Sequence, residues 1–308
     1  MRSTMRAVVK LAAAMMVAIG FVAVASWAET GYRVALPGCP ETCGNVTVPY
    51  PFGIGEKCSC KKGAFNLTCD SDSRLWTNWT SGVQITAIDY VNGQMQVLMP
   101  VSRICYNESG SEEIFENYRV PNMFTISPEE NKFFAVGCDA SASFLGLTDH
   151  GIFLTRCRPK CDRAPEKKES GNCAGRGCCQ ATIPVFGLRE FKLGVKSLGF
   201  GKKVGEFKNC TYVFVARKGW YHFIPEDLTH LRFGWAPMAV DWDVGHGNQT
   251  CESAVAGEGY VCEKSSTECV ETTFDLGYHC RCKDGFHGNP YLPSGCQSKD
   301  LFSASPFL

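Results

Sequence analysis

The chain has 308 residues, 31 Lys and Arg against 31 Asp and Glu, and 19 cysteines. That length is too great for one small disulfide knot and fits two or three modules. So many cysteines favour a compartment in which thiols oxidise over a reducing cytosol, and their odd number leaves at least one thiol unpaired or bound to another chain.

The formal net charge of zero hides an uneven distribution. Residues 29–155 carry 8 basic and 14 acidic side chains, residues 156–218 carry 15 and 5, and residues 219–308 carry 5 and 12. A basic centre between two acidic flanks indicates either a polyanionic partner or attraction between neighbouring modules. Charge alone does not choose between these two.

The N-terminus has the layout of a secretory signal peptide. Three basic residues precede an apolar stretch from Leu11 to about Ala25, and Ser26 and Ala28 place small residues before Glu29. The alternative is a retained membrane anchor, because the apolar run, counted to Ala28, reaches the short edge of what spans a bilayer. The Ala-rich composition favours cleavage after Ala28, and no later segment is apolar and long enough to cross a membrane.

Six N-x-S/T sequons predict a glycosylated surface behind that signal. None of them has Pro at the middle position. The acceptor residues are Asn45, Asn66, Asn78, Asn107, Asn209 and Asn248.

The pattern of the mature chain is rich in β-strands, and convincing amphipathic helices are scarce. Asn92-Gly93 separates two alternating runs and predicts a hairpin turn in which both central positions have positive φ. Glu226–Leu231 would supply one or two helical turns. The expected strands are Val83–Val91, Gln94–Val97, Lys132–Val136 and Thr211–Arg217.

Composition also suggests where modules meet. Arg163–Gly177 is polar, charged and Gly-bearing, and is predicted to be an exposed connection held at its ends by Cys161 and Cys178. One module boundary is expected just before this connection, and another near Gly245–Asn248.

The C-terminal cysteines resemble an EGF-like module. They are Cys251, Cys262, Cys269, Cys280, Cys282 and Cys296, with the close pair C-R-C, then K-D-G-F and Gly288 before the last cysteine. Such a short segment buries too little apolar area for a core, so bridges replace it. The resemblance implies the bridges Cys251–Cys269, Cys262–Cys280 and Cys282–Cys296. No acidic run precedes Cys251, and Glu271 stands where a calcium-binding version has Asp or Asn, so no calcium is expected.

The N-terminal motifs resemble the galacturonan-binding domain of plant wall-associated receptor kinases. They are C-P-E-T-C-G-N-V-T-V-P-Y-P-F-G-I-G at 39–55 and F-N-L-T-C at 65–69. The match continues through N-K-F-F-A-V-G-C-D at 131–139, G-C-C-Q-A-T-I-P at 177–184, N-C-T-Y-V-F-V at 209–215 and G-F-H-G-N-P-Y-L-P-S-G-C-Q at 285–297.

In that family the extracellular part binds pectin, a polymer of galacturonic acid, and precedes a transmembrane helix and a kinase. This chain ends eleven residues after Gln297, without either of them. Cys60 resembles an extra cysteine in C-S-C, which would explain the odd count. The expected fold is mainly β, with small disulfide-rich β modules followed by the EGF-like module. The expected domains are a signal peptide at 1–28, a galacturonan-binding domain at 29–105, a second cysteine-rich β domain at 106–245, the EGF-like module at 246–297 and a tail at 298–308.

Other chemistry finds little support in the sequence. Cysteines spaced for zinc compete poorly with disulfides outside the cell, and adjacent Cys178 and Cys179 are expected to bridge to two different partners. No H-E-x-x-H pair, nucleophile turn or phosphate loop is present. Asp241 and Asp243, which would mimic a glycosidase pair, are predicted to lie in a solvated loop. The tryptophans are expected in the core rather than on sugar rings: Trp76, Trp79, Trp220, Trp235 and Trp242.

The sequence therefore favours a secreted, non-catalytic protein that binds cell-wall pectin and needs no cofactor or metal. A polyuronide carries one carboxylate on each sugar, so its binder needs several converging cations, because each exposed pair contributes only ~0.2–1 kcal/mol. The candidates are Lys57, Lys61 and Lys62 in the N-terminal domain, and Arg156, Arg158, Lys202 and Lys203 in the basic segment. The alternatives are a module that binds a peptide or another receptor ectodomain, and a secreted hydrolase.

Overall fold

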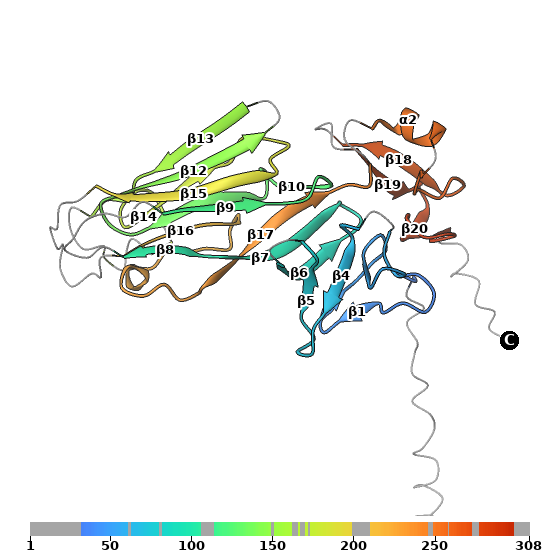
Figure 1. Ribbon diagram of the computed structural model, residues 1–308, viewed down its shortest axis with the longest axis horizontal. Coiled ribbons are helices and arrows are strands. Elements are labelled where there is room, and N and C mark those ends of the chain that lie inside the picture. Colours follow the sequence, from blue (N-terminus) through green and yellow to red (C-terminus); the bar gives the residue numbers. More distant parts are fainter. Residues whose placement is uncertain are drawn as a thin grey trace, which may run out of the picture. The chain divides into compact units, whose positions relative to one another are not determined.

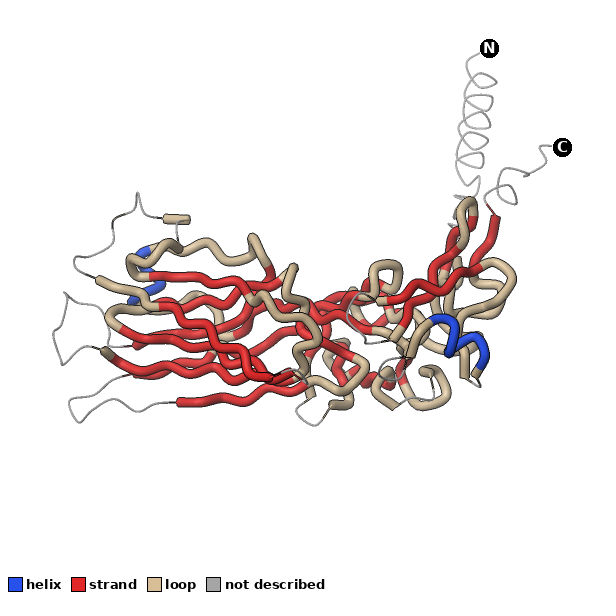
Figure 2. Tube along the Cα trace, turned by 90° about the horizontal axis from the view of Figure 1, so that it is seen from above, coloured by secondary structure: helices blue, strands red, loops and turns tan. Residues whose placement is uncertain are grey.

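The computed structural model describes residues 32–60, 63–79, 82–105, 114–148, 151–161, 166, 170–171, 173–198, 210–245, 249–257, 259–272 and 277–298. Strands dominate these residues, as Figure 2 shows, and one α-helix and one 3-10 turn interrupt them. The mainly β, disulfide-rich class predicted from the sequence is confirmed. Residues 1–28, the predicted signal peptide, lie outside the described residues, and no helix within the described ranges is long and apolar enough to cross a membrane.

A seven-stranded sheet combines the five strands between residues 53 and 100 with two strands from later in the chain (Figure 1). In β7 (Gln94–Pro100), Met95, Val97 and Met99 are buried while the residues between them are half-exposed, which is the period of a strand with one face in the core. The order across the sheet is β10 (Phe124–Ile126), β17 (Trp235–Trp242), β7 (Gln94–Pro100), β6 (Gln84–Asp89), β5 (Leu75–Thr77), β4 (Asn66–Cys69) and β3 (Gly53–Ile54). A separate two-stranded sheet contains β1 (Thr42–Cys43) and β2 (Val46–Thr47).

The predicted hairpin at Asn92-Gly93 is the connection between β6 and β7. Asp89 pairs with Gln94, so the turn has four residues rather than two. Of Asn92 and Gly93 only Gly93 has positive φ (64°), and the expectation of positive φ at both positions is wrong. The Asp89 carboxylate accepts the N–H groups of Val91 and Asn92, each at 3.0 Å, which stabilises the longer turn without a second left-handed residue.

Two four-stranded antiparallel sheets pack face to face as a sandwich. One contains β14 (Cys178–Thr182), β11 (Asn131–Val136), β16 (Cys210–Arg217) and β8 (Ser102–Cys105); the other contains β13 (Gly151–Cys157), β12 (Ala140–Thr148), β15 (Glu190–Ser197) and β9 (Ile114–Arg119). Their inner faces meet where the buried rings of Phe133 and Phe144 lie 5.9 Å apart. The Cys157–Cys179 bridge joins β13 to β14 and so ties the two layers together.

The outer face of the β14-β11-β16-β8 sheet is covered by the segment that follows β16. Phe134 and Phe214 stack on this face at 5.3 Å, and the ring of Tyr221 meets both edge-on at 5.4 and 5.2 Å. The same segment contains η2 (Pro225–Leu228), a single 3-10 turn. The helix predicted at Glu226–Leu231 is therefore one short turn that seats a second apolar cluster on the sheet.

Nine disulfide bridges join eighteen of the nineteen cysteines, all of which lie in the described residues. Adjacent Cys178 and Cys179 bridge to different partners, Cys173 and Cys157, as predicted. The remaining thiol belongs to Cys60 and is buried. Outside the C-terminal module the other bridges are Cys39–Cys58, Cys43–Cys69, Cys105–Cys210 and Cys138–Cys161.

The pairing of strands corrects one of the module boundaries suggested by composition. β11 lies before Arg163 and pairs with β14 and β16, which lie after it. The prediction of a module boundary just before Arg163 is therefore wrong, because the polar segment connects strands that belong to the same sandwich. The division at residue 105 remains a prediction; β7, which precedes it, pairs with β17, which follows it.

Candidate functional site

Lys57 lies at the exposed tip of a tight loop that follows β3. The N–H of Gly55 donates to the carbonyl of Leu67 at 3.3 Å, and the Cys39–Cys58 bridge anchors the loop from the other side. Gly53 is required beneath it, because a Cβ there would lie 2.0 Å from the carbonyl oxygen of Cys58. A rigid backbone therefore presents Lys57 to solvent. Its predicted companions Lys61 and Lys62 lie outside the described residues.

The second predicted cluster is placed only in part. Arg156 lies at the end of β13 and Arg158 just beyond it, and both are exposed. Lys202 and Lys203 lie outside the described residues. The structure thus shows two of these four cations as solvent-facing and does not test the convergence of the set.

An aromatic and charged cluster between β4 and β5 has no counterpart among the predicted site residues. The Arg74 guanidinium forms ion pairs with Asp70 (2.9 Å) and Asp72 (2.6 Å) and lies 5.8 Å from the centre of the Trp76 ring. The Trp76 Nε1–H donates to Asp70 at 2.8 Å. The backbone N–H of Arg74, followed by side-chain donors, lowers the pKa of Asp70 to about 2. The charge of Arg74 is therefore already matched by carboxylates of the protein.

Two of the predicted glycosylation sites share one face of the seven-stranded sheet. Thr68 is paired with Trp76 across β4 and β5, and alternation along each strand places Asn66 and Asn78 on that same face. The hydroxyl of Thr68 donates to Oδ1 of Asn78 at 2.7 Å. Glycans at these two asparagines would crowd the surroundings of Trp76. Among the other sequons, Asn45 is exposed in the turn between β1 and β2, while Asn107, Asn209 and Asn248 lie outside the described residues.

The tryptophans divide between core and surface. Trp242 is buried against Phe52 at a centroid distance of 5.0 Å, and Trp79 packs partly buried against Phe124 at 4.9 Å. The expectation of core positions is wrong for Trp220 and Trp235, which are 39% and 55% exposed. Their indole rings have the large apolar surface and single donor that interfaces use.

The prediction that Asp241 and Asp243 lie in a solvated loop is wrong. Asp241 lies on β17 and accepts a hydrogen bond from Nε2 of Gln94 at 3.0 Å. Burial is the main cause that raises its pKa. Asp243 is only 2% exposed. The pairing of β17 with β7 and β10 decides the position of Asp241, and pairing between strands distant in the sequence leaves no local mark.

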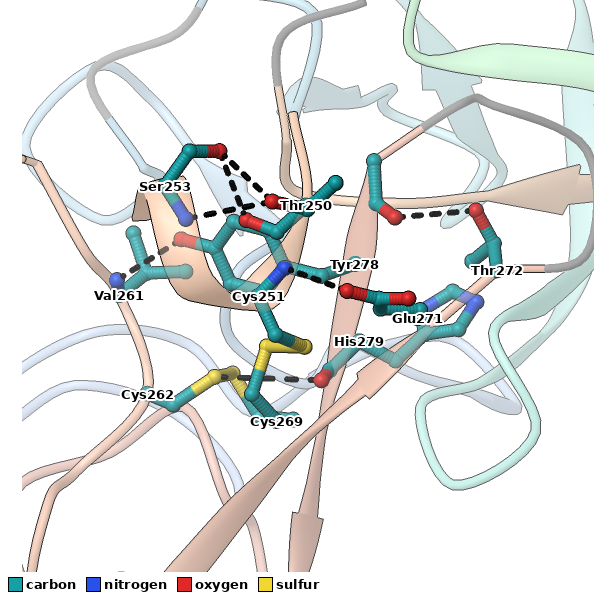
Figure 3. The surroundings of a disulfide bond; sticks show 12 residues. Thr250, Cys251, Ser253, Val261, Cys262, Cys269, Glu271, Thr272, Tyr278 and His279 are labelled. Carbon is teal, nitrogen blue, oxygen red and sulfur yellow. Dashed lines mark hydrogen bonds between the residues drawn. A yellow bond between two sulfur atoms is a disulfide. The ribbon is translucent and has the colours of Figure 1, made fainter. Parts of the chain in front are cut away.

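The C-terminal module is built on three bridges, shown in part in Figure 3. Cys251–Cys269, Cys262–Cys280 and Cys282–Cys296 are the pairs that the EGF-like resemblance implies. Glu271 accepts the backbone N–H of Cys251 at 3.2 Å (Figure 3), and the described residues contain no cluster of three metal-ligating side chains. The elements of the C-terminal module are α2 (Cys251–Ala256), β18 (Thr267–Glu271), β19 (Tyr278–Cys282), β20 (Phe286–Gly288) and β21 (Cys296–Ser298).

Comparison with known proteins identifies the relatives of this chain. Residues 39–99 match the family model described as wall-associated receptor kinase galacturonan-binding. Wall-associated receptor kinases 2 and 1 of Arabidopsis thaliana are 36% and 35% identical to the chain over 263 and 264 residues. The chain is similar to the extracellular part of wall-associated receptor kinases. The resemblance predicted from the motifs is thus confirmed.

These alignments cover 84% of this chain and 34% of each wall-associated receptor kinase. The chain spans about a third of the length of the curated relatives that it matches, and the matched region is not their catalytic part. Wall-associated receptor kinase-like 5 of the same plant is more distant, at 26% identity over 304 residues. No solved structure matches the chain.

Within the region matched by the wall-associated receptor kinase model, the described cations are Lys57 and Arg74. Arg74 is held by two carboxylates, whereas Lys57 forms no ion pair with any residue that the structure describes. An incoming carboxylate would have to displace Asp70 and Asp72 from Arg74, but only water from Lys57. The loop of Lys57 is therefore the better candidate for anion binding in this region.

Proposed function

We propose that the chain is an extracellular, non-catalytic protein that binds polygalacturonate, the de-esterified form of pectin. The match of residues 39–99 to a galacturonan-binding family model carries this proposal. The exposed Lys57 on its bridged loop supports it, because a carboxylate on each sugar offers repeated partners for a lysine. Secretion after removal of residues 1–28 and location in the cell wall belong to the same proposal.

The proposal predicts binding that depends on charge. Exposed ion pairs are screened beyond ~10 Å at 0.1 M salt, so affinity for immobilised polygalacturonate should fall as ionic strength rises. Methyl-esterified pectin lacks the carboxylate charges and should bind more weakly. Neither polymer should release reducing sugar on incubation with the chain; release would favour a hydrolase instead.

The location of the site is tested by charge reversal. Replacing Lys57, Lys61 and Lys62 by Glu removes three attractions, each ~0.2–1 kcal/mol, and adds repulsion, so affinity should fall about tenfold or more. The variant K202E/K203E should lose less. If K202E/K203E abolishes binding while the triple variant binds normally, the site is wrong and the function stands.

A second candidate function is recognition of a protein, such as another receptor ectodomain. The exposure of Trp220 and Trp235 favours it, since tryptophan is enriched among the residues that dominate protein interfaces. Under this function the variant W220S/W235S keeps its affinity for polygalacturonate. A loss of that affinity would assign the two indole rings to the sugar.

A further inference from the structure

The outer face of the β13-β12-β15-β9 sheet is open to solvent, whereas that of the β14-β11-β16-β8 sheet is covered. On β13 the exposed residues alternate, with Ile152 71% exposed and Leu154 45% exposed. The inner face is buried against the sandwich core through Phe144 and Phe191. The other sheet has its outer face covered by the cluster around Tyr221, whereas side chains on this one remain open to solvent.

Strand register brings cations from distant parts of the sequence together on this open face. Arg156 of β13 pairs with Ser143 of β12, and Ser143 pairs with Gly194 of β15. Lys192 and Lys196 stand two residues before and after Gly194, and therefore on the same face. Neighbouring strands lie about 4.8 Å apart with a rise of about 3.3 Å per residue, so the Cα atoms of the two lysines are ~13 Å apart and that of Arg156 is ~12 Å from each.

Small residues form the floor between Lys196 and Arg156. Ser141 pairs with Lys196, and Ser143 donates a hydrogen bond to the carbonyl of Gly194 at 3.4 Å. Lys196 and Arg156 thus flank a hydroxyl-bearing area, and Lys192 pairs with Leu145 in the adjoining row. We define these cations and this floor, together with Arg119 in the next row, as the basic sheet face.

The charges of the basic sheet face are not neutralised from within the described part of the chain. Arg119, Arg156, Lys192 and Lys196 form no ion pair with any described residue. The carboxylate present in the same rows is that of Glu190, which is paired with Arg119 across the sheet but forms no ion pair with it. Four cations against one carboxylate leave a positive surface, and none of the six sequon asparagines lies on these four strands.

We propose that the basic sheet face is a second binding surface for an extended polycarboxylate, separate from the 39–99 region; this inference rests on the proposed function. Cations spaced by ~12–13 Å along neighbouring strands suit a linear polymer with regularly repeated carboxylates. A second copy of the chain that docked through the same face would bring like charges together, which disfavours a symmetric dimer at this surface. A long polymer that contacts both surfaces of one chain binds bivalently, so long polygalacturonate should bind more tightly than short oligogalacturonides.

The test compares K192E/K196E with wild type, using long polygalacturonate and trigalacturonate as probes at low ionic strength. The matched control is K218E/K264E, which reverses two exposed lysines on other elements. K192Q/K196Q serves as a milder second variant, and circular dichroism with thermal unfolding checks that all variants fold. Poly-glutamate is the third probe and represents an acidic protein.

We expect K192E/K196E to lower the affinity for long polygalacturonate about tenfold, equivalent to ~1.4 kcal/mol, while affinity for trigalacturonate and both affinities of the control change less than about twofold. K192Q/K196Q should show the same loss to a smaller extent. If K192E/K196E and the control behave alike, this inference is overturned and the proposed function stands. If wild type binds poly-glutamate more tightly than polygalacturonate through these lysines, the face serves an acidic protein and the inference is wrong. If wild type binds neither galacturonate probe, the proposed function fails and the inference fails with it.

Discussion

Asn289 offers a test of how the C-terminal module is held against the N-terminal residues. Its side chain is fully buried, and Nδ2 donates to the carbonyl oxygens of Val34 (2.8 Å) and Tyr50 (2.7 Å) while Oδ1 accepts the N–H of Tyr291 (3.0 Å). The substitution N289A removes all three hydrogen bonds. A buried polar group left without its partner costs ~1–3 kcal/mol. The carbonyl oxygen of Val34 still accepts the N–H of Tyr50 in this variant, so its loss is partly compensated. We therefore expect a total loss of about 2–4 kcal/mol in the free energy of unfolding.

The variant N289D separates the donor from the shape of the side chain. It keeps an acceptor for Tyr291 but turns a carboxylate toward two carbonyl oxygens, so at pH 7 it should destabilise at least as much as N289A. Urea unfolding with the bridges intact measures both, followed by the fluorescence of Trp242, whose ring lies 5.6 Å from that of Tyr291. An N289D protein as stable as wild type would refute the role given to the two donated hydrogen bonds.

Three further predictions concern stability and the thiol. Burial lowers the pKa of His279 from 6.5 to about 4, so its contribution is fully present above pH 6.5 and is lost as pH falls toward 4, by up to ~3 kcal/mol; H279F should flatten the pH dependence of urea unfolding in that window, and an unchanged slope would contradict this. Removing the bridge between Cys157 and Cys179, which closes 22 residues, in a double alanine variant should cost ~3 kcal/mol by the same assay, whereas a loss below ~1 kcal/mol would show that packing alone holds the two layers. The thiol of Cys60 is buried, so Ellman's reagent should find one thiol per chain after unfolding and almost none before; rapid reaction in the native protein would contradict its burial.

Local patterns in the sequence predicted much of the fold. The alternation in Gln94–Val97 and the apolar run in Thr211–Arg217 became β7 and β16, because such patterns report directly which side chains face a core. The spacing of the last six cysteines likewise led to the pairing found in the structure through its EGF-like resemblance. The separate partners of Cys178 and Cys179 followed from the geometry of adjacent cysteines.

Pairing between distant strands could not be predicted in this way. β17 follows β7 by more than a hundred residues and joins it in one sheet, and that register places Asp241 beside Gln94, which no local pattern indicates. The same limit applies to the candidate sites. Lys57 was found because it lies between two recognisable motifs, whereas Arg156 and Lys192 stand on one face only because β12 pairs with both β13 and β15.

We propose that this chain binds polygalacturonate through its own cations and leaves the polymer uncleaved. Titration of the purified mature chain with de-esterified polygalacturonate in a calorimeter, at low ionic strength and again at 0.1 M salt and above, tests it most directly. We expect saturable binding that weakens as salt rises, because charges are screened beyond ~10 Å at 0.1 M salt, and we expect to recover the polymer at its original length. An absence of binding at low ionic strength, or binding indifferent to both salt and methyl-esterification, would contradict it.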